Sequence, residues 1–159
     1  MSHKVPFFIR TSFLTEILNE QKHVEVDEQQ ILTVCNTIIT DAGYQTGRLG
    51  VFLTDNATIR EINIRHLGHD YATDVVSFVL EQSENHLEGE LAISAETAQE
   101  RAAEFGWNEK SELLLYAIHG TLHLVGYDDQ TPNDSRVMRQ KESDYLATLG
   151  IKQSKISTF

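Results

Sequence analysis

The segment from residue 108 to 126, NEKSELLLYAIHGTLHLVG, constrains the fold of this chain more than any other. A helix that is apolar over most of its circumference must be surrounded by other elements, because a surface position would leave apolar side chains in water. We therefore predict that residues 108–126 form the central helix of the molecule. Two histidines, His119 and His123, interrupt the apolar run in its C-terminal half.

The rest of the chain alternates between segments of strand type and segments of helix type. Apolar spacing and capping residues predict further helices at 27–43, 56–68, 94–106 and 131–150. Apolar runs predict strands at 5–11, 46–55, 73–80 and 89–94. The connection between the strands at 73–80 and 89–94 is short enough for a hairpin. The connections between the other strands are long enough for parallel pairing. We expect one domain over residues 1–159, of α/β or α+β class, with a mixed sheet of about four strands packed against several helices.

The formal net charge of −11 sets a condition on function. An acidic protein repels nucleic acid at long range, so an RNA-binding site here needs a local positive feature. A bound cation is one such feature. Arginines gathered by the fold are another, and the candidates are Arg10, Arg48, Arg60 and Arg65.

Cysteine content and apolar segment length indicate the compartment. The single cysteine, Cys35, excludes an intramolecular disulfide, and its apolar helical surroundings predict a buried core residue. No segment approaches the roughly 18 apolar residues of a membrane span. The N-terminal residues 1–13 lack the apolar core and cleavage site of a signal peptide. We expect a cytoplasmic protein.

The stretch HGTLHLVGYDD, residues 119–129, contains the pattern of a metal site at the end of the central helix. His119 and His123 share one helix face, which suits two imidazoles on one ion. Two ordinary helix histidines are the alternative, but unpaired polar groups are costly in apolar surroundings. Gly126 lets the chain turn back. A third ligand ten residues after the first corresponds to Asp129, and Asp128 falls one residue short.

The residue after the first histidine is Gly120, where zinc peptidases with this spacing carry a glutamate base. Glycine cannot transfer a proton, so a peptidase would need another base, with Asp128 and Glu90 as candidates. Three protein ligands leave a coordination position open, which favours catalysis over a closed structural site. Two histidines and a carboxylate also occur in non-haem iron oxygenases, but a β-barrel pattern is not found here.

The motif resembles that of the YbeY family, metal-dependent endoribonucleases specific for single strands. Their signature is H-G-x-L-H-L-x-G-Y-D-H, and residues 119–129 match it except at the last position, where Asp129 replaces histidine. Two further blocks of the family follow the expected order. They are Asn63 with TDVVSF at 73–78, and GELAIS at 89–94.

The resemblance implies an enzyme that acts in ribosomal RNA processing and maturation and in ribosome quality control. The implied partners are single-stranded regions of ribosomal RNA and proteins of the small ribosomal subunit, with no membrane and no nucleotide cofactor. Two alternatives stay open at this point. One is a small hydrolase of the zinc metallopeptidase type, and the other is a metal-stabilised ribosome-assembly factor without catalysis.

The resemblance also implies that His119, His123 and Asp129 hold one ion per chain, with Zn²⁺ the expected metal. The carboxylate is a harder ligand than imidazole and extends the choice to manganese, magnesium or iron. Such an ion would act as a Lewis acid on a phosphate oxygen and lower the pKa of a bound water. The arginine that the family often carries corresponds to Leu67. We predict that Arg65, two residues earlier, is the catalytic phosphate contact; a solvated helix arginine is the alternative.

Overall fold

The computed structural model describes residues 12–153, and the predicted strand at 5–11 lies outside them. The strands are β1 (Ser12–Asn19), β2 (Thr46–Thr54), β3 (Val75–Gln82) and β4 (His86–Ser94). The helices are α2 (Glu28–Asp41), α3 (Asn56–Leu67), α4 (Ala95–Phe105), α5 (Glu109–Leu124) and α6 (Pro132–Thr148). Each predicted helix is present, and no end differs from its predicted bound by more than two residues.

The four strands form one mixed sheet in the order β1-β2-β4-β3. β1 pairs with β2 and β2 with β4 in parallel, whereas β3 and β4 are antiparallel. A short turn joins β3 to β4, closed by a hydrogen bond of 2.9 Å from the Ser83 N–H to the His86 carbonyl. The hairpin and the mixed four-stranded sheet confirm the predicted fold class.

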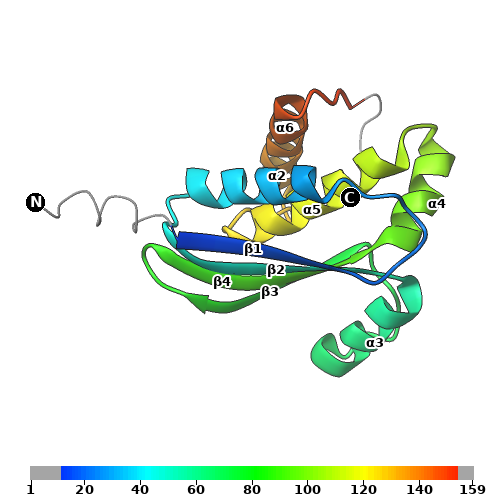
Figure 1. Cartoon of the computed structure of the whole chain (residues 1–159), viewed down its shortest axis with the longest axis horizontal. Helices are drawn as coiled ribbons and strands as arrows, with labels where there is room; N and C mark the ends of the chain where they lie inside the picture. Colours follow the sequence, from blue (N-terminus) through cyan, green and yellow to red (C-terminus); the bar gives the residue numbers. More distant parts are fainter. Residues whose placement is uncertain (1–11, 154–159) are drawn as a thin grey trace, which may run out of the picture.

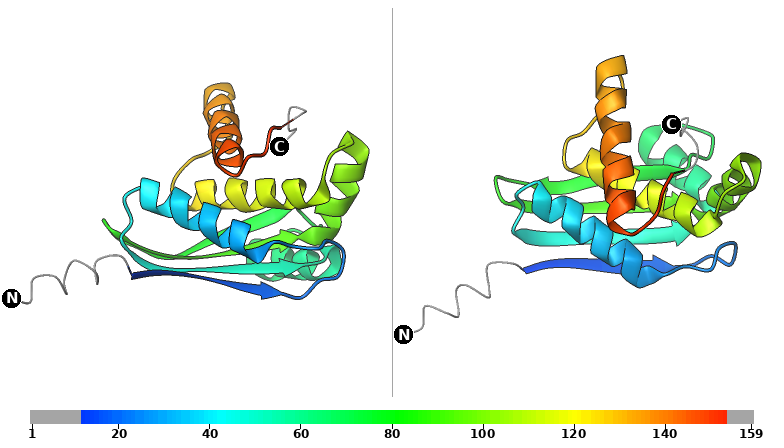
Figure 2. Two further views of the ribbon diagram at one scale, coloured as in Figure 1. Left: turned by 45° about the horizontal axis from the view of Figure 1, so that its top comes forward. Right: turned by 90° about the horizontal axis from the view of Figure 1, so that it is seen from above.

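The helices are distributed unevenly over the two faces of the sheet (Figure 1). α2 and α5 cover one face, and α6 lies on the outer side of α5 (Figures 1 and 2). Every residue from Glu112 to Leu122 is buried, so α5 is the central helix that its apolar sequence predicted. On the opposite face, α3 covers only one end (Figure 1). We call the rest of that surface the open face.

β1 is the element of the described chain that the sequence did not predict. Phe13 and Ile17 pack against the core below α2, while Leu14 and Leu18 point to the open face and are 55% and 56% exposed. Because both faces of the strand carry apolar residues, the alternation that normally identifies a strand is obscured.

Cys35 on α2 lies at the contact between α2 and α5. Its side chain is fully buried, and its sulfur accepts a hydrogen bond from the Thr121 hydroxyl at 3.3 Å. Burial raises the pKa of the thiol to about 11, since a charged thiolate is poorly solvated there. Cys35 is therefore a core residue, as predicted. None of the helices within residues 12–153 combines the length and hydrophobicity of a membrane-spanning segment.

Candidate metal centre

The C-terminal half of α5 presents two histidines on one side. His119 and His123 are one helical turn apart, and their ring centroids are separated by 4.6 Å with an interplanar angle of 83°. The two Nε2 atoms face each other at 3.0 Å. The helix thus places two imidazole nitrogens at one point, as the four-residue spacing predicted.

The end of α5 brings a carboxylate back to this point. Gly126 adopts a positive φ of 109°, a conformation that favours glycine. The Gly126 N–H donates to the His123 carbonyl at 3.1 Å, and the Tyr127 N–H donates to the Leu122 carbonyl at 3.0 Å. These bonds close the helix and reverse the chain, so that Asp129 returns toward the histidines.

Asp129 completes a compact set of three donor atoms. Its Oδ2 lies 3.6 Å from His119 Nε2 and 3.7 Å from His123 Nε2. Ligands at about 2.0–2.1 Å from a tetrahedral ion are roughly 3.3–3.4 Å apart, so this triangle fits a metal ion with small adjustments. The neighbouring Asp128 is exposed, and its Oδ1 accepts the Asp129 N–H at 2.7 Å. The candidate metal site is therefore His119, His123 and Asp129.

A buried glutamate from α6 stands behind His119. Glu142 Oε2 lies 2.6 Å from His119 Nδ1, and both side chains are buried. An ionised carboxylate can only accept a hydrogen bond, so Nδ1 carries the proton and Nε2 offers its lone pair to an ion. The sequence interpretation missed Glu142. The sequence did contain an indication of its burial. Met138, Glu142 and Leu146 are spaced four residues apart, which places a carboxylate in the buried stripe of α6.

The donor atoms lie at a cleft of about 380 Å³ between α5, β3 and α3. Its lining residues are Asn63, Leu67, Thr73, Asp74, Val75, Val76, Ser77, Val79, His119, His123 and Leu124. Asn63 Nδ2 donates to the Tyr71 carbonyl at 2.9 Å and to the Thr73 hydroxyl at 3.1 Å, which fixes the loop between α3 and β3. The Ser77 hydroxyl donates to the Gly120 carbonyl at 3.0 Å and ties β3 to α5.

Gly120 faces the sheet rather than the donor atoms. A Cβ atom at this position would lie 2.9 Å from Leu91 Cδ2, 2.9 Å from Val75 Cγ2 and 3.2 Å from Ser77 Oγ. These distances are too short for an unstrained contact, so the glycine allows α5 to approach β3 and β4 closely. The site therefore lacks a proton-transferring group at the position where zinc peptidases have one.

Comparison with known proteins identifies the family. The sequence profile described as Endoribonuclease YbeY matches residues 16–150 of the chain. This chain belongs to the YbeY family of endoribonucleases. As a YbeY protein it is a metal-dependent hydrolase, and the three blocks found in the sequence lie within the matched region.

Individual YbeY relatives differ in how much of their length is matched. The chain is 46% identical over 112 residues to Endoribonuclease YbeY of Rhodopirellula baltica. This aligned region covers 69% of this chain and 58% of that protein. It is 37% identical over 147 residues to Endoribonuclease YbeY of Desulforamulus reducens, covering 85% and 96%. A solution structure of TM1509 from Thermotoga maritima superposes with a TM-score of 0.59 at 24% identity, over 86% of this chain and 91% of that one. This last likeness concerns the fold.

The arginine expected in a YbeY site has no equivalent in the cleft. Leu67 occupies its position and lines the cleft, whereas Arg65 is exposed on α3 and is not a lining residue. The role of Arg65 stays a prediction.

The other arginines named from the sequence are not gathered at the cleft. Arg60 Nε pairs with Asp70 Oδ1 at 2.6 Å on the surface of α3. Arg48 lies beside Gly50 on the open face, and Arg10 lies outside the described residues. No arginine of residues 12–153 lines the cleft, so the candidate metal site is the feature of this cleft that could supply positive charge.

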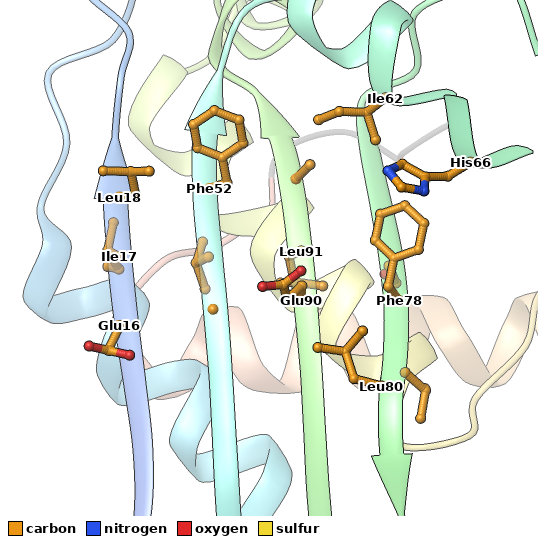
Figure 3. Close-up of a pocket in the computed structure, with 15 residues that line it drawn as sticks. Glu16, Ile17, Leu18, Phe52, Ile62, His66, Phe78, Leu80, Glu90 and Leu91 are labelled. Carbon is orange, nitrogen blue, oxygen red and sulfur yellow. The ribbon is translucent and has the colours of Figure 1, made fainter. Parts of the chain in front are cut away.

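Glu90, one base considered for a peptidase, lies on the other side of the sheet (Figure 3). It lines a second cleft of about 880 Å³ on the open face, where its side chain is 3.6 Å from the point at which a Cβ of Gly50 would lie. The adjacent Leu91 points the opposite way and contacts Gly120 of α5. Glu90 is therefore separated from His119 by the sheet and is not placed to act as a base there.

Proposed function

We propose that this YbeY protein cleaves single-stranded ribosomal RNA by metal-assisted phosphodiester hydrolysis at His119, His123 and Asp129. The proposal depends on one observation, the three donor atoms that lie within 3.0–3.7 Å of one another beside a cleft. Zn²⁺ is the proposed ion, and manganese, magnesium or iron are alternatives because one donor is a carboxylate. A divalent ion in this position supplies Lewis acidity to a phosphate oxygen and to a water molecule.

The surrounding side chains keep the donors oriented and partly dry. Glu142 contacts His119 through Nδ1, and Leu67, Val75 and Leu124 are among the apolar residues of a lining that also contains polar ones. Where apolar side chains exclude water from the cleft, the local dielectric constant is lower. The attraction between a bound cation and a phosphate is then stronger.

Access to the site supports the preference for single strands. His123 and Asp129 are 30% and 31% exposed, so a substrate phosphate can approach from their side. A cleft of about 380 Å³ is near the lower end of ligand sites, and it has room for one unstacked nucleotide unit rather than a duplex. We further propose that the partners are ribosomal RNA and small-subunit proteins in the cytoplasm.

Arg65 is proposed to contact a phosphate of the RNA strand outside the cleft. Support comes from its exposed position on α3, the helix that contributes Asn63 and Leu67 to the cleft. Arg65→Ala is then expected to lower kcat/KM on RNA by about 10–100-fold, the equivalent of a charged hydrogen bond of about 1.5–3 kcal/mol. Metal occupancy should not change. The control is Arg60→Ala, since Asp70 already pairs with that arginine. Equal kcat/KM values in both variants and in the parent would mean that Arg65 is a solvent-exposed helix residue without a role in RNA cleavage.

A cleavage assay with three substrates tests the proposed function. The substrates are an unstructured RNA, a duplex RNA and a peptide, each incubated with the metal-loaded protein and with the chelated protein. Only the unstructured RNA should be cut, and only when metal is present. Peptide cleavage would favour a metallopeptidase. A protein that binds metal and cuts none of the three would favour a ribosome-assembly factor without catalysis.

A further inference from the structure

We propose that Glu142 is the positioning residue of the metal centre. Its carboxylate determines which nitrogen of His119 faces the ion. The inference rests on the proposed metal-dependent function and adds to it the residue that determines how tightly the metal is held. Glu142 belongs to α6, outside the motif at 119–129.

Orientation is the first part of the argument. The distance of 2.6 Å between Glu142 Oε2 and His119 Nδ1 is in the range of a short, charge-assisted hydrogen bond. This bond places the imidazole proton on Nδ1 and leaves the lone pair on Nε2. That nitrogen is the one that lies 3.0 Å from His123 Nε2 and 3.6 Å from Asp129 Oδ2. The tautomer that binds metal is therefore present before an ion arrives.

The two histidines differ in how firmly they are held. His119 is buried and bonded on its far side, whereas His123 is 30% exposed, and no residue of the described chain forms a hydrogen bond with its Nδ1. Asp129 is similarly exposed and lies on the turn after α5. His119 is thus the fixed ligand around which the other two adjust, and its fixed position depends on Glu142.

Burial is the second part. The Glu142 side chain is only 1% exposed, and its other oxygen, Oε1, has no hydrogen-bond partner within residues 12–153. A buried carboxyl group is costly, so helix docking alone does not favour one at this position. Its contact with His119 Nδ1 ties it to the candidate metal site.

A purely structural role makes a different prediction. The pair Glu142–His119 also links α6 to α5, but Met138 and Leu146, one turn away on either side, are buried and dock α6 without it. If the pair served only to join the helices, Glu142→Gln would lower stability and leave metal affinity unchanged. As a positioning residue, Glu142 affects the metal affinity, while the metal-free Glu142→Gln protein keeps the parental Tm.

The decisive experiment is a competition titration with Zn²⁺ on the full chain. The parent, Glu142→Gln and Glu112→Gln are compared, each with a Tm measured without metal. Glu112, on α5, is the matched control because it is a buried glutamate like Glu142. Its side chain accepts a hydrogen bond from Trp107 Nε1 at 2.7 Å, and it lies at the end of α5 that is far from the site. The Kd should rise by about 10–100-fold in Glu142→Gln, as for other residues that orient ligands, and stay at the parental value in Glu112→Gln.

The outcomes separate the inference from the proposed function. A parent that binds no metal contradicts the proposed function. A parent that binds metal with the same Kd as Glu142→Gln overturns the inference alone. If Glu142→Gln does not fold, Glu142→Asp decides: it keeps the charge but shortens the reach to His119 Nδ1, and a parental Kd in this variant overturns the inference.

A spectroscopic measurement adds a readout that a structural role would not move. In the Co²⁺-loaded protein, the Nδ1 proton of a ligating histidine gives a paramagnetically shifted resonance that disappears when it exchanges rapidly with water. The His119 proton should persist in the parent and in Glu112→Gln, and exchange faster in Glu142→Gln. Equal exchange in all three proteins would overturn the assignment of Glu142.

Discussion

The two faces of the sheet carry clefts of very different character. The open face has the larger cleft, about 880 Å³, lined by apolar side chains with Glu16 and Glu90 among them (Figure 3). The helix-covered side has a cleft of about 380 Å³ in which His119 and His123 lie beside Asp129. The candidate metal site lies at the smaller cleft, where donor atoms converge and a buried carboxylate contacts one of the histidines. Volume alone does not identify a functional site.

Glycines show the same contrast at the level of packing. Gly120 is pressed against Leu91 and Val75, whereas a Cβ at Gly50 would have its nearest atoms at 3.6 Å, in the flexible side chain of Glu90. One face is tightly packed around the candidate site and the other has room. The predictions below test whether function and stability follow this division.

The largest expected effect is loss of the ligands. His119→Ala or His123→Ala should release the metal and abolish RNA cleavage while the far-ultraviolet circular dichroism of the fold is kept. Glu90→Gln on the open face should leave both metal content and cleavage at the parental level. Metal content by atomic absorption and a cleavage assay are sufficient. Full cleavage in a histidine variant that has lost its metal would remove the ion from the mechanism.

Paired glycine substitutions test the packing contrast. Gly120→Ala gains helix propensity but forces a methyl group against β-branched Val75, so unfolding free energy should fall by about 1–2 kcal/mol. Gly50→Ala should leave it unchanged or raise it by less than about 1 kcal/mol, because the added methyl group meets no close neighbour and the unfolded chain loses freedom. Urea denaturation measures both. Equal losses would mean that the open face is packed as tightly as the covered one.

The smallest effect concerns the third ligand. Asp129→His restores the histidine of the YbeY signature, and this variant should bind Zn²⁺ at least as tightly as the parent while its affinity for Mn²⁺ and Mg²⁺ falls. Asp128→His is the control, since Asp128 is exposed and its Oδ1 accepts a hydrogen bond from the Asp129 N–H. Competition titrations provide the comparison. An unchanged metal preference in Asp129→His, or a changed one in Asp128→His, would show that Asp129 is not the ligand.

Local geometry explains why the candidate metal site was predictable. Its three members lie on one helix and the turn that follows, so the spacing of His119, His123 and Asp129 determines where they meet. Glu142 comes from another helix, and its contact with His119 depends on how α6 docks on α5. No spacing rule encodes that docking, although a carboxylate in an apolar stripe was a signal.

The fold was predictable to a similar limit. The predominantly apolar segment 108–126 predicted a central helix, and the short connection after residue 80 allowed the β3–β4 hairpin. Alternation places Glu90 and Leu91 on opposite faces of β4, but it does not say which face the helices cover. Glu90 could therefore be named as a candidate base until the packing of Leu91 against Gly120 placed it on the open face.

Reconstitution of the metal-free protein tests the central claim most directly. The chelated protein is returned to Zn²⁺ in steps below one equivalent, and cleavage of an unstructured RNA is measured at each step. We predict no cleavage without metal, a linear rise with added ion, and a plateau at one ion per chain. Cleavage by the metal-free protein at the parental rate, or a rise that begins only after the first equivalent, would contradict the assignment of catalysis to the single site at His119, His123 and Asp129.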